Sequence, residues 1–201
     1  MSAGGEFRDL LAAHADGPAL LRLTRYAELI EQWSGRHNLV RFSNRAELVQ
    51  RHIIEALAAA PLLSGSGRLL DVGSGAGLPG VPLLAARPRW GGVLLEPRQK
   101  RWAFLRTVVR ELGLEADVAC SRYQELGDYP LFDLVTIRAV GDHEAVLEWA
   151  RGRLAGTGEV VIWTTVEGEA ALAAIAGWRV LSSQLPGLDC GRLARLQPCF
   201  T

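Results

Sequence analysis

The residues best suited to chemistry lie in one short stretch of the chain. Apolar residues lead to Asp71, and a segment with four glycines follows directly. Because glycine lacks a Cβ and tolerates positive φ, such a segment lets the backbone approach a ligand closely. A second apolar run ends in Glu96, whose carboxylate can accept hydrogen bonds from both ribose hydroxyls of an adenosine-type ligand. The pattern predicts a nucleotide-like site, and the alternative is a structural βαβ unit without a ligand.

The elements that must hold these residues alternate between strands and helices. Apolar runs bounded by turn signals predict strands at residues 69–72, 93–96, 116–120, 132–137, 160–163, 180–185 and 192–197. Stretches with helical signals lie between them, at residues 79–87, 97–112, 142–154 and 169–176. The alternation predicts an α/β fold, doubly wound around a mostly parallel seven-stranded sheet that ends in an antiparallel pair.

Residues 1–60 differ from the rest because their apolar residues recur at helical spacing. Asn44 or Ser43 is placed to cap a helix there, with Glu47 completing a capping box. A loop rich in serine and glycine follows. We therefore divide the chain into a small N-terminal helical cap, residues 1–60, and an α/β domain, residues 61–201.

Composition limits the class of protein. With 201 residues, of which 49% are hydrophobic, the chain can bury a full core, and no run of 18 uninterrupted apolar residues suggests a membrane span. The N-terminus carries acids and no basic segment, unlike a signal peptide. Cys120, Cys190 and Cys199 lack metal-ligand spacing and fit a reducing cytosol as buried or unreactive thiols. We expect a cytoplasmic protein with no metal and no membrane partner, and we expect a monomer.

The net charge of zero hides two basic segments. Residues 87–110 carry seven basic residues against one acid, and residues 36–51 carry four against one. A neutral protein with basic patches can bind an RNA backbone, because only the contacting face needs the positive field. Charge alone is equally consistent with solvated arginines on an ordinary surface.

The glycine segment has a specific resemblance. Its spacing, with an acid directly before the first glycine, resembles motif I of class I S-adenosylmethionine (SAM) methyltransferases. The longer string at residues 71–82, DVGSGAGLPGVP, is similar to the RsmG (GidB) family of ribosomal RNA small-subunit methyltransferases. The resemblance implies the Rossmann-like class I fold, SAM as cofactor, and small-subunit ribosomal RNA or the 30S particle as partner. It also implies transfer of a methyl group to N7 of a guanosine in 16S ribosomal RNA.

The resemblance also implies which residues bind SAM. Residues 122–125 (RYQE) resemble the family's R-x-E-(E/D), a segment that packs against the adenine, with Gln124 in place of an acid. The ammonium group in the amino-acid tail of SAM can pair with a carboxylate such as Asp71. For Arg122 the alternative is a role as an internal ion-pair partner. The expected cofactor-binding residues are Asp71, Gly73, Ser74, Gly75, Gly77, Leu78, Glu96, Arg122, Tyr123, Gln124, Glu125 and Arg138.

Three residues are expected on the substrate side, in the catalytic site. Arg138 follows the fourth strand in a segment similar to the family's R-A-(F/V), and its fork of donors suits a guanine edge or a phosphate. Asn38 and His52 match the family patterns W-N-x-x-x-N-L-T and H-(I/V)-x-D-S-L. The structural alternatives are an ion pair for Arg138, a turn or cap role for Asn38, and helix packing for His52. Lys100 and Arg101 match a basic pair of the family and suit either RNA phosphates or a solvated face.

Departures from the family pattern leave other functions open. Val40, Glu55, Ala56 and Thr164 replace the family's usual residues, and the family's C-terminal tail is missing. A methyltransferase acting on another RNA, a protein or a small molecule is therefore one alternative, and a weakly active SAM- or RNA-binding factor is another. A nicotinamide dehydrogenase is least favoured, since the chain offers no second catalytic domain.

Overall fold

A computed structural model describes residues 3–199, except for the side chains of Ala3, Arg36 and His37. The helices that precede the sheet are α1 (Ala3–Leu11), α2 (Gly17–His37), α3 (Arg45–Leu48), the π-helical turn η1 (Val49–Ile54), α4 (Glu55–Leu57) and the 3-10 turn η2 (Ala60–Leu62). The strands are β1 (Gly67–Val72), β2 (Trp90–Leu95), β3 (Ala116–Ala119), β4 (Phe132–Arg138), β5 (Leu154–Thr165), β6 (Trp178–Gln184) and β7 (Gly191–Pro198). The helices between them are α5 (Gly80–Ala86), α6 (Gln99–Leu112), the 3-10 turn η3 (Tyr123–Glu125), α7 (His143–Arg151) and α8 (Val166–Ala173).

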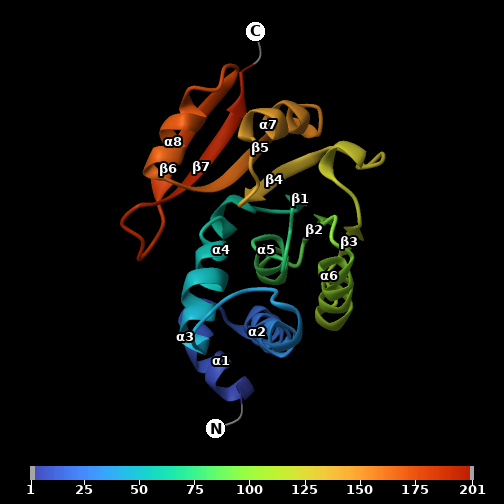
Figure 1. Ribbon diagram of the computed structural model, residues 1–201, viewed down its shortest axis with the longest axis vertical. Helices are drawn as coiled ribbons and strands as arrows, with labels where there is room; N and C mark the ends of the chain where they lie inside the picture. Colours follow the sequence, from blue (N-terminus) through green and yellow to red (C-terminus); the bar gives the residue numbers. More distant parts are fainter. Residues whose placement is uncertain (1–2, 200–201) are drawn as a thin grey trace.

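The seven strands form one sheet in the order β3-β2-β1-β4-β5-β7-β6 (Figure 1). The first five strands are parallel to their neighbours, and β7 runs antiparallel between β5 and β6. Helices α5 and α6 cover one face and α7 and α8 the other. The doubly wound, mostly parallel fold expected from the sequence is confirmed.

The central strand shows why this sequence forms a buried parallel strand. Successive side chains of a strand point to opposite faces of the sheet. In β1, Leu69 packs in the hydrophobic cluster under α5 and α6, whereas Leu70 and Val72 pack in the cluster under α7 and α8. All three are buried, as expected for a strand with both faces covered.

The N-terminal helices share the core of the sheet rather than enclosing a core of their own. Residues of α1 and α2 lie in the same hydrophobic cluster as Leu69 and Phe104, and Trp33 meets Phe104 edge-on at a ring distance of 5.4 Å. The fully buried Tyr26 donates a hydrogen bond of 2.8 Å from its hydroxyl to the carbonyl oxygen of Ala76, in the glycine segment. The helical cap therefore supports the turn after β1, and its division from the α/β domain at residue 60 stays a prediction.

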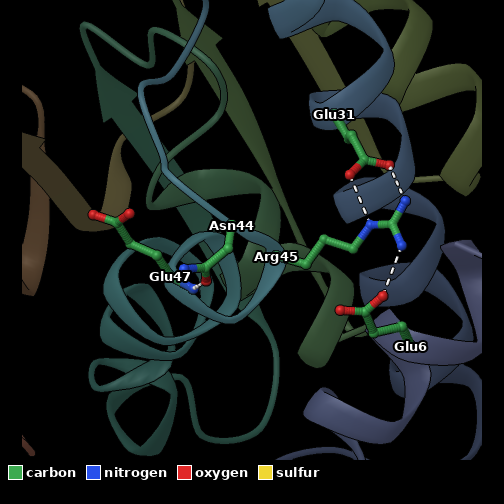
Figure 2. Close-up of polar contacts among 5 residues, drawn as sticks. All are labelled: Glu6, Glu31, Asn44, Arg45 and Glu47. Atoms are coloured by element: carbon green, nitrogen blue, oxygen red, sulfur yellow. Dashed lines mark hydrogen bonds and ion pairs between the residues drawn. The ribbon is translucent and has the colours of Figure 1, made fainter.

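Arg45 ties the first three helices together. Its guanidinium donates to both carboxylate oxygens of Glu31, at 2.7 and 3.0 Å, and to Glu6 at 2.7 Å (Figure 2). At the same helix start, the Asn44 side chain accepts a 2.9 Å hydrogen bond from the backbone N–H of Glu47. The predicted cap is thus Asn44, and these contacts fix the start of the helical run that continues through the π-helical turn.

The bounds of several elements and the exposure of the cysteines differ from what the sequence predicted. Strand β5 begins at Leu154 rather than at residue 160, because Leu154 already pairs with Phe132 of β4, ahead of a register shift between the two strands. All three cysteines are free and exposed, so of the two expectations for these thiols burial was wrong, and low reactivity stays a prediction. Within residues 3–199, no helix is both long and apolar enough to cross a bilayer.

Candidate functional site

The glycine segment makes a tight turn directly after β1. Gly73 adopts φ +71°, a left-handed conformation that is strained for residues with a side chain. A Cβ at this position would also lie 2.9 Å from Cγ2 of Val140. The turn is closed by Ser74, whose backbone N–H donates to the Leu95 carbonyl at 2.9 Å and whose hydroxyl donates to the Asp71 carbonyl at 2.9 Å. Residue 73 must therefore be glycine for the turn to keep this shape.

Asp71 lies behind this turn. Its Oδ1 accepts a 2.8 Å hydrogen bond from the Thr136 hydroxyl, and its Oδ2 accepts one of 3.2 Å from the backbone N–H of Gly80. Burial raises the pKa of this carboxyl to about 6, although both hydrogen bonds act in the opposite direction. Because both oxygens face the protein interior and Asp71 lines neither cavity described below, the carboxylate braces β1 against β4 and α5. The expected contact of Asp71 with an ammonium group stays a prediction.

Glu96 holds the other side of the turn. Its Oε2 accepts a 2.9 Å hydrogen bond from the backbone N–H of Gly75, and its Oε1 accepts one of 2.8 Å from the backbone N–H of Arg98. The side chain is only 3% exposed, yet it lines a cavity. Each carboxylate oxygen has a second lone pair, so Glu96 can still accept hydrogen bonds from a ligand.

The glycine-loop cavity, of about 290 Å³, opens beside this turn. It is lined by residues 72–73 after β1, 95–98 after β2, Arg101 of α6, 121–124 after β3, and 139–140 after β4. All of these lie at the carboxyl ends of parallel strands, on either side of the point where the strand order reverses. Doubly wound sheets bind their ligands at such a switch point.

The structure brings together part of the expected cofactor set. Gly73, Glu96, Arg122, Tyr123 and Gln124 line the glycine-loop cavity. The remaining members of the set lie behind the lining or shape the turns: Asp71, Ser74, Gly75, Gly77, Leu78 and Glu125. Among the latter, Glu125 accepts a 3.3 Å hydrogen bond from the backbone N–H of Arg122 and so closes the η3 turn. Arg122 itself is exposed and has no ion pair within the described part of the chain, so its alternative role as an internal partner is not realised.

Arg101, which the sequence left open as a contact to RNA phosphates or part of a solvated face, lines the glycine-loop cavity. Its Nη1 lies 3.8 Å from the position that a Cβ on residue 75 would occupy, which places the guanidinium over the glycine turn. Among residues 3–199 no hydrogen bond or ion pair of its side chain is found. Lys100, its neighbour, is exposed and lines no cavity, because consecutive helical residues point about 100° apart. Both residues match the family's basic pair, so the sequence match did not indicate which of them would line a cavity.

A second cavity, the cap cavity, has a volume of about 590 Å³ and lies on the other side of Ala139. Three parts of the chain line it: residues 41–55 of the helical cap, the ends of β4 and β5, and the loop between β6 and β7. That loop extends on the same side of the molecule as α4 (Figure 1). Ala139 lines both cavities and has φ +56°, which is unusual for a residue with a Cβ. Backbone strain of this kind often marks a functional site.

Arg138 lies in the cap cavity and not in the glycine-loop cavity, where a cofactor-binding role would place it. Its Nη2 donates to Oε1 of Glu55 at 3.0 Å and to the backbone carbonyl of Arg51 at 3.3 Å. Its Nη1 is buried and has no hydrogen-bond partner among the described residues. The ion pair that was its structural alternative is therefore present, and it still leaves N–H donors of Arg138 unused.

His52 and Asn38, matched to the family in the same way, have different positions. His52 lines the cap cavity, and its Nε2 donates to the Arg41 carbonyl at 3.3 Å. Burial and the nearby Arg138 guanidinium lower the pKa of His52, so the ring is neutral at neutral pH. Asn38 is exposed at the C-terminal cap of α2 with φ +48° and lines neither cavity, which is the cap role given as its alternative. No group of three or more potential metal ligands is found in residues 3–199.

Sequence comparison identifies relatives over most of the chain. A family model described as GidB, rRNA small subunit methyltransferase G, matches residues 20–176. A protein from Laribacter hongkongensis named ribosomal RNA small subunit methyltransferase G is 34% identical over 183 residues, or 87% of this chain and 86% of the relative. A protein of the same name from Chromobacterium violaceum is 34% identical over 187 residues, or 90% of each chain. A third, from Nitrosomonas europaea, is 40% identical over 131 residues, or 65% of this chain and 61% of the relative.

Solved structures of methyltransferases share the fold. A putative O-methyltransferase from Klebsiella pneumoniae superposes with a TM-score of 0.63 at 16% identity, covering 98% of this chain and 97% of the other. A precorrin-6y C5,15-methyltransferase from Geobacter metallireducens gives 0.59 at 15% identity, covering 71% and 87%. TYW2 of M. jannaschii, solved in complex with AdoMet, gives 0.57 at 12% identity, covering 73% and 74%. The fold is therefore the Rossmann-like fold of class I methyltransferases, and the match over residues 20–176 shows that the chain belongs to the GidB family, rRNA small subunit methyltransferase G.

Proposed function

We propose that this protein is a cytoplasmic enzyme that transfers a methyl group from SAM to N7 of a guanosine in 16S ribosomal RNA. Membership of the GidB family supports an RNA methyltransferase, since the relatives are named for the small-subunit RNA. The observation that carries the proposal is the pair of cavities that share Ala139 at the carboxyl end of β4. Two adjoining cavities are what a reaction between a bound methyl donor and a bound acceptor requires.

The glycine-loop cavity fits SAM. Its wall at Gly73 is a cradle that a Cβ would fill, and the carboxylate of Glu96, which lines it, has lone pairs for the ribose hydroxyls. Tyr123 and Gln124 would lie beside the adenine, and the unpaired guanidinium of Arg101 suits the carboxylate of the amino-acid tail. When bound, SAM supplies an electrophilic methyl group on a sulfonium centre.

The acceptor chemistry agrees with the side chains in the cap cavity. Guanine N7 carries a lone pair and no proton, so attack on a methyl group needs no general base. The protein then has to hold the nitrogen in line with the methyl group. Orienting two reactants in this way can lower a barrier by about 7–11 kcal/mol. Arg138 is suited to this role, because it lines the cap cavity and Glu55 holds in place a guanidinium fork that can donate to guanine O6.

The proposal is tested by transfer of label from radiolabelled SAM to small-subunit ribosomal RNA from a strain deleted for this gene. We expect label in the RNA with the wild-type protein, and at least a tenfold lower rate with Gly73→Ala or Arg138→Ala. Gly156→Ala is the matched control for the first variant, because residue 156 has ordinary φ and open space where a Cβ would lie. Tight SAM binding without label in the RNA would contradict the proposal and favour a different substrate.

A further inference from the structure

We propose that the cap cavity holds one nucleotide turned out of the RNA strand, with Arg41 and Arg51 bound to the phosphates on either side of it. This inference rests on the proposed function and adds the place of the acceptor and the residues that grip its backbone. Sequence-specific proteins generally read RNA through unstacked bases that are splayed out of the strand. A cavity of about 590 Å³ lies within the range of sites that bury most of a small ligand.

The position of the cavity is the first argument. An acceptor atom must reach the methyl group, so the acceptor site has to open onto the cofactor site. Only Ala139 is common to the linings of the two cavities, and it lies directly after Arg138 at the end of β4. A base that enters the cap cavity as far as Arg138 therefore arrives beside the glycine-loop cavity.

The charges of the lining are the second argument. Arg41 and Arg51 are exposed, and their guanidinium groups form no hydrogen bond or ion pair with any described residue. Two acids of the lining are already engaged: Glu47 accepts a 2.6 Å hydrogen bond from the backbone N–H of Ser43, and Glu55 pairs with Arg138. The lining carries three arginines and three carboxylates and so has no net charge, but Arg41 and Arg51 are cations in it that no described carboxylate pairs with. Guanidinium forks bind phosphate oxygens in pairs, which suits them to a nucleic-acid backbone.

A third acid of the lining fits the base rather than the backbone. The carboxylate of Asp189, in the loop between β6 and β7, is exposed and has no partner among residues 3–199. A guanine whose N7 faces the methyl donor turns its N1–H and N2–H₂ donors away from it. Asp189 can accept from those donors, whereas a phosphate would be repelled, so the two arginines and the acid together favour a guanine nucleotide over a bare phosphate.

The local backbone of the cap supports a binding role. The helical run from Arg45 to Leu57 is interrupted by the π-helical turn η1, which carries Arg51 and His52. Such turns are frequent at functional sites. Around this turn the Arg51 carbonyl accepts from Arg138 at 3.3 Å, and the backbone carbonyl of Glu55 accepts a 2.9 Å hydrogen bond from the indole N–H of Trp163. Arg51 is thus presented from a segment that is bonded to the ends of β4 and β5, and Arg41, which precedes α3, is held to that segment by the hydrogen bond from His52 to its carbonyl.

Helix α6 offers a second basic face, and the experiment has to separate the two. Arg106 lies over the ring of Trp102 at 4.8 Å, and Arg110 is 78% exposed. Neither residue lines the cap cavity. If RNA bound mainly along α6, loss of Arg41 and Arg51 would have little effect.

The first measurement is the salt dependence of binding to small-subunit ribosomal RNA. For Arg41→Ala/Arg51→Ala we expect the slope of log Kd against log salt to fall by about 1.4–1.8, because each lost phosphate contact removes about 0.7–0.9. Arg110→Ala/Arg179→Ala removes the same charge elsewhere on the surface and is expected to leave the slope unchanged. An unchanged slope for the first pair, or an equal fall for both pairs, would overturn the inference.

The second measurement uses Cys190, which is exposed and lines the cap cavity. In a Cys120→Ser/Cys199→Ser protein, alkylation of Cys190 by iodoacetamide is timed with and without the same RNA. We expect the RNA to slow alkylation at least fivefold, and equal rates would overturn the inference. Both measurements report on where RNA binds and not on methyl transfer. A wild-type protein that transfers label to the RNA but fails them refutes this inference alone, whereas absence of label refutes the proposed function.

Discussion

Replacing Asp71 by asparagine tests whether burial raises the pKa of this carboxyl group and so makes stability depend on pH. Its pKa is raised from 3.8 to about 6 in the folded protein, chiefly because ionisation is disfavoured in the interior. The folded state therefore holds the proton more tightly than the unfolded state does. The resulting stability is fully present below about pH 3.8 and is lost as the pH rises through about 6. The difference between these two pKa values corresponds to about 3 kcal/mol over the whole window, of which about 1 kcal/mol falls between pH 5 and pH 8.

The assay is urea unfolding followed by tryptophan fluorescence at several pH values between 5 and 8. Asparagine does not titrate, so the wild type is expected to lose about 1 kcal/mol more unfolding free energy over this range than Asp71→Asn does. The variant also leaves one of two hydrogen-bond donors, Thr136 or Gly80, without an acceptor, but that offset is independent of pH and cancels. Asp117→Asn, which removes an exposed carboxylate from β3, is the matched control. If the unfolding free energies of the wild type and Asp71→Asn changed equally with pH, or if the wild type lost less than the variant, the raised pKa would be contradicted.

Three further substitutions test the turn and the cap. Gly73→Ala should lower the unfolding free energy by about 1–2 kcal/mol, because of its φ of +71°, and weaken SAM binding in calorimetry, while Gly156→Ala should do neither. Tyr26→Phe should cost about 1–3 kcal/mol in chemical denaturation, since a buried carbonyl of the glycine segment loses its donor; an unchanged midpoint would show that this hydrogen bond contributes nothing. Asn38→Gly should leave methyl transfer unchanged and stability equal or higher by less than about 1 kcal/mol, because glycine tolerates its φ of +48°; a tenfold loss of activity would place Asn38 in contact with substrate.

The parts of the fold that the sequence predicted depend on local patterns. Apolar runs and turn signals are properties of a few neighbouring residues, and they placed all seven strands and the antiparallel last pair. The placement of Glu96 at the edge of a cavity follows equally from its position at the end of an apolar run. Where glycines lie inside a strand, as at the start of β5, the same patterns predict a loop, and the boundary was six residues late.

The parts that the sequence did not predict depend on contacts between distant residues. The side chain of Asp71 turns inward because its partner, Thr136, lies on the neighbouring strand β4. His52 reaches a cavity and Asn38 does not, although short family patterns matched both. The difference arises because a π-helical turn presents one of them, while the other ends a helix at the surface. Motifs locate residues along the chain, whereas the direction of each side chain is set by tertiary packing.

The central claim is that the methyl group arrives on guanine N7, and the chemistry of that product allows a direct test. N7 methylation leaves a positively charged ring that can be reduced with borohydride, after which aniline cleaves the RNA strand at the modified nucleotide. Small-subunit ribosomal RNA from a strain deleted for this gene would be incubated with the protein and SAM, treated in this way, and mapped by primer extension. We expect one new cleavage site at a guanosine, absent without SAM and at least tenfold weaker with Gly73→Ala. Methyl groups incorporated into the RNA without any new cleavage would contradict N7 as the acceptor.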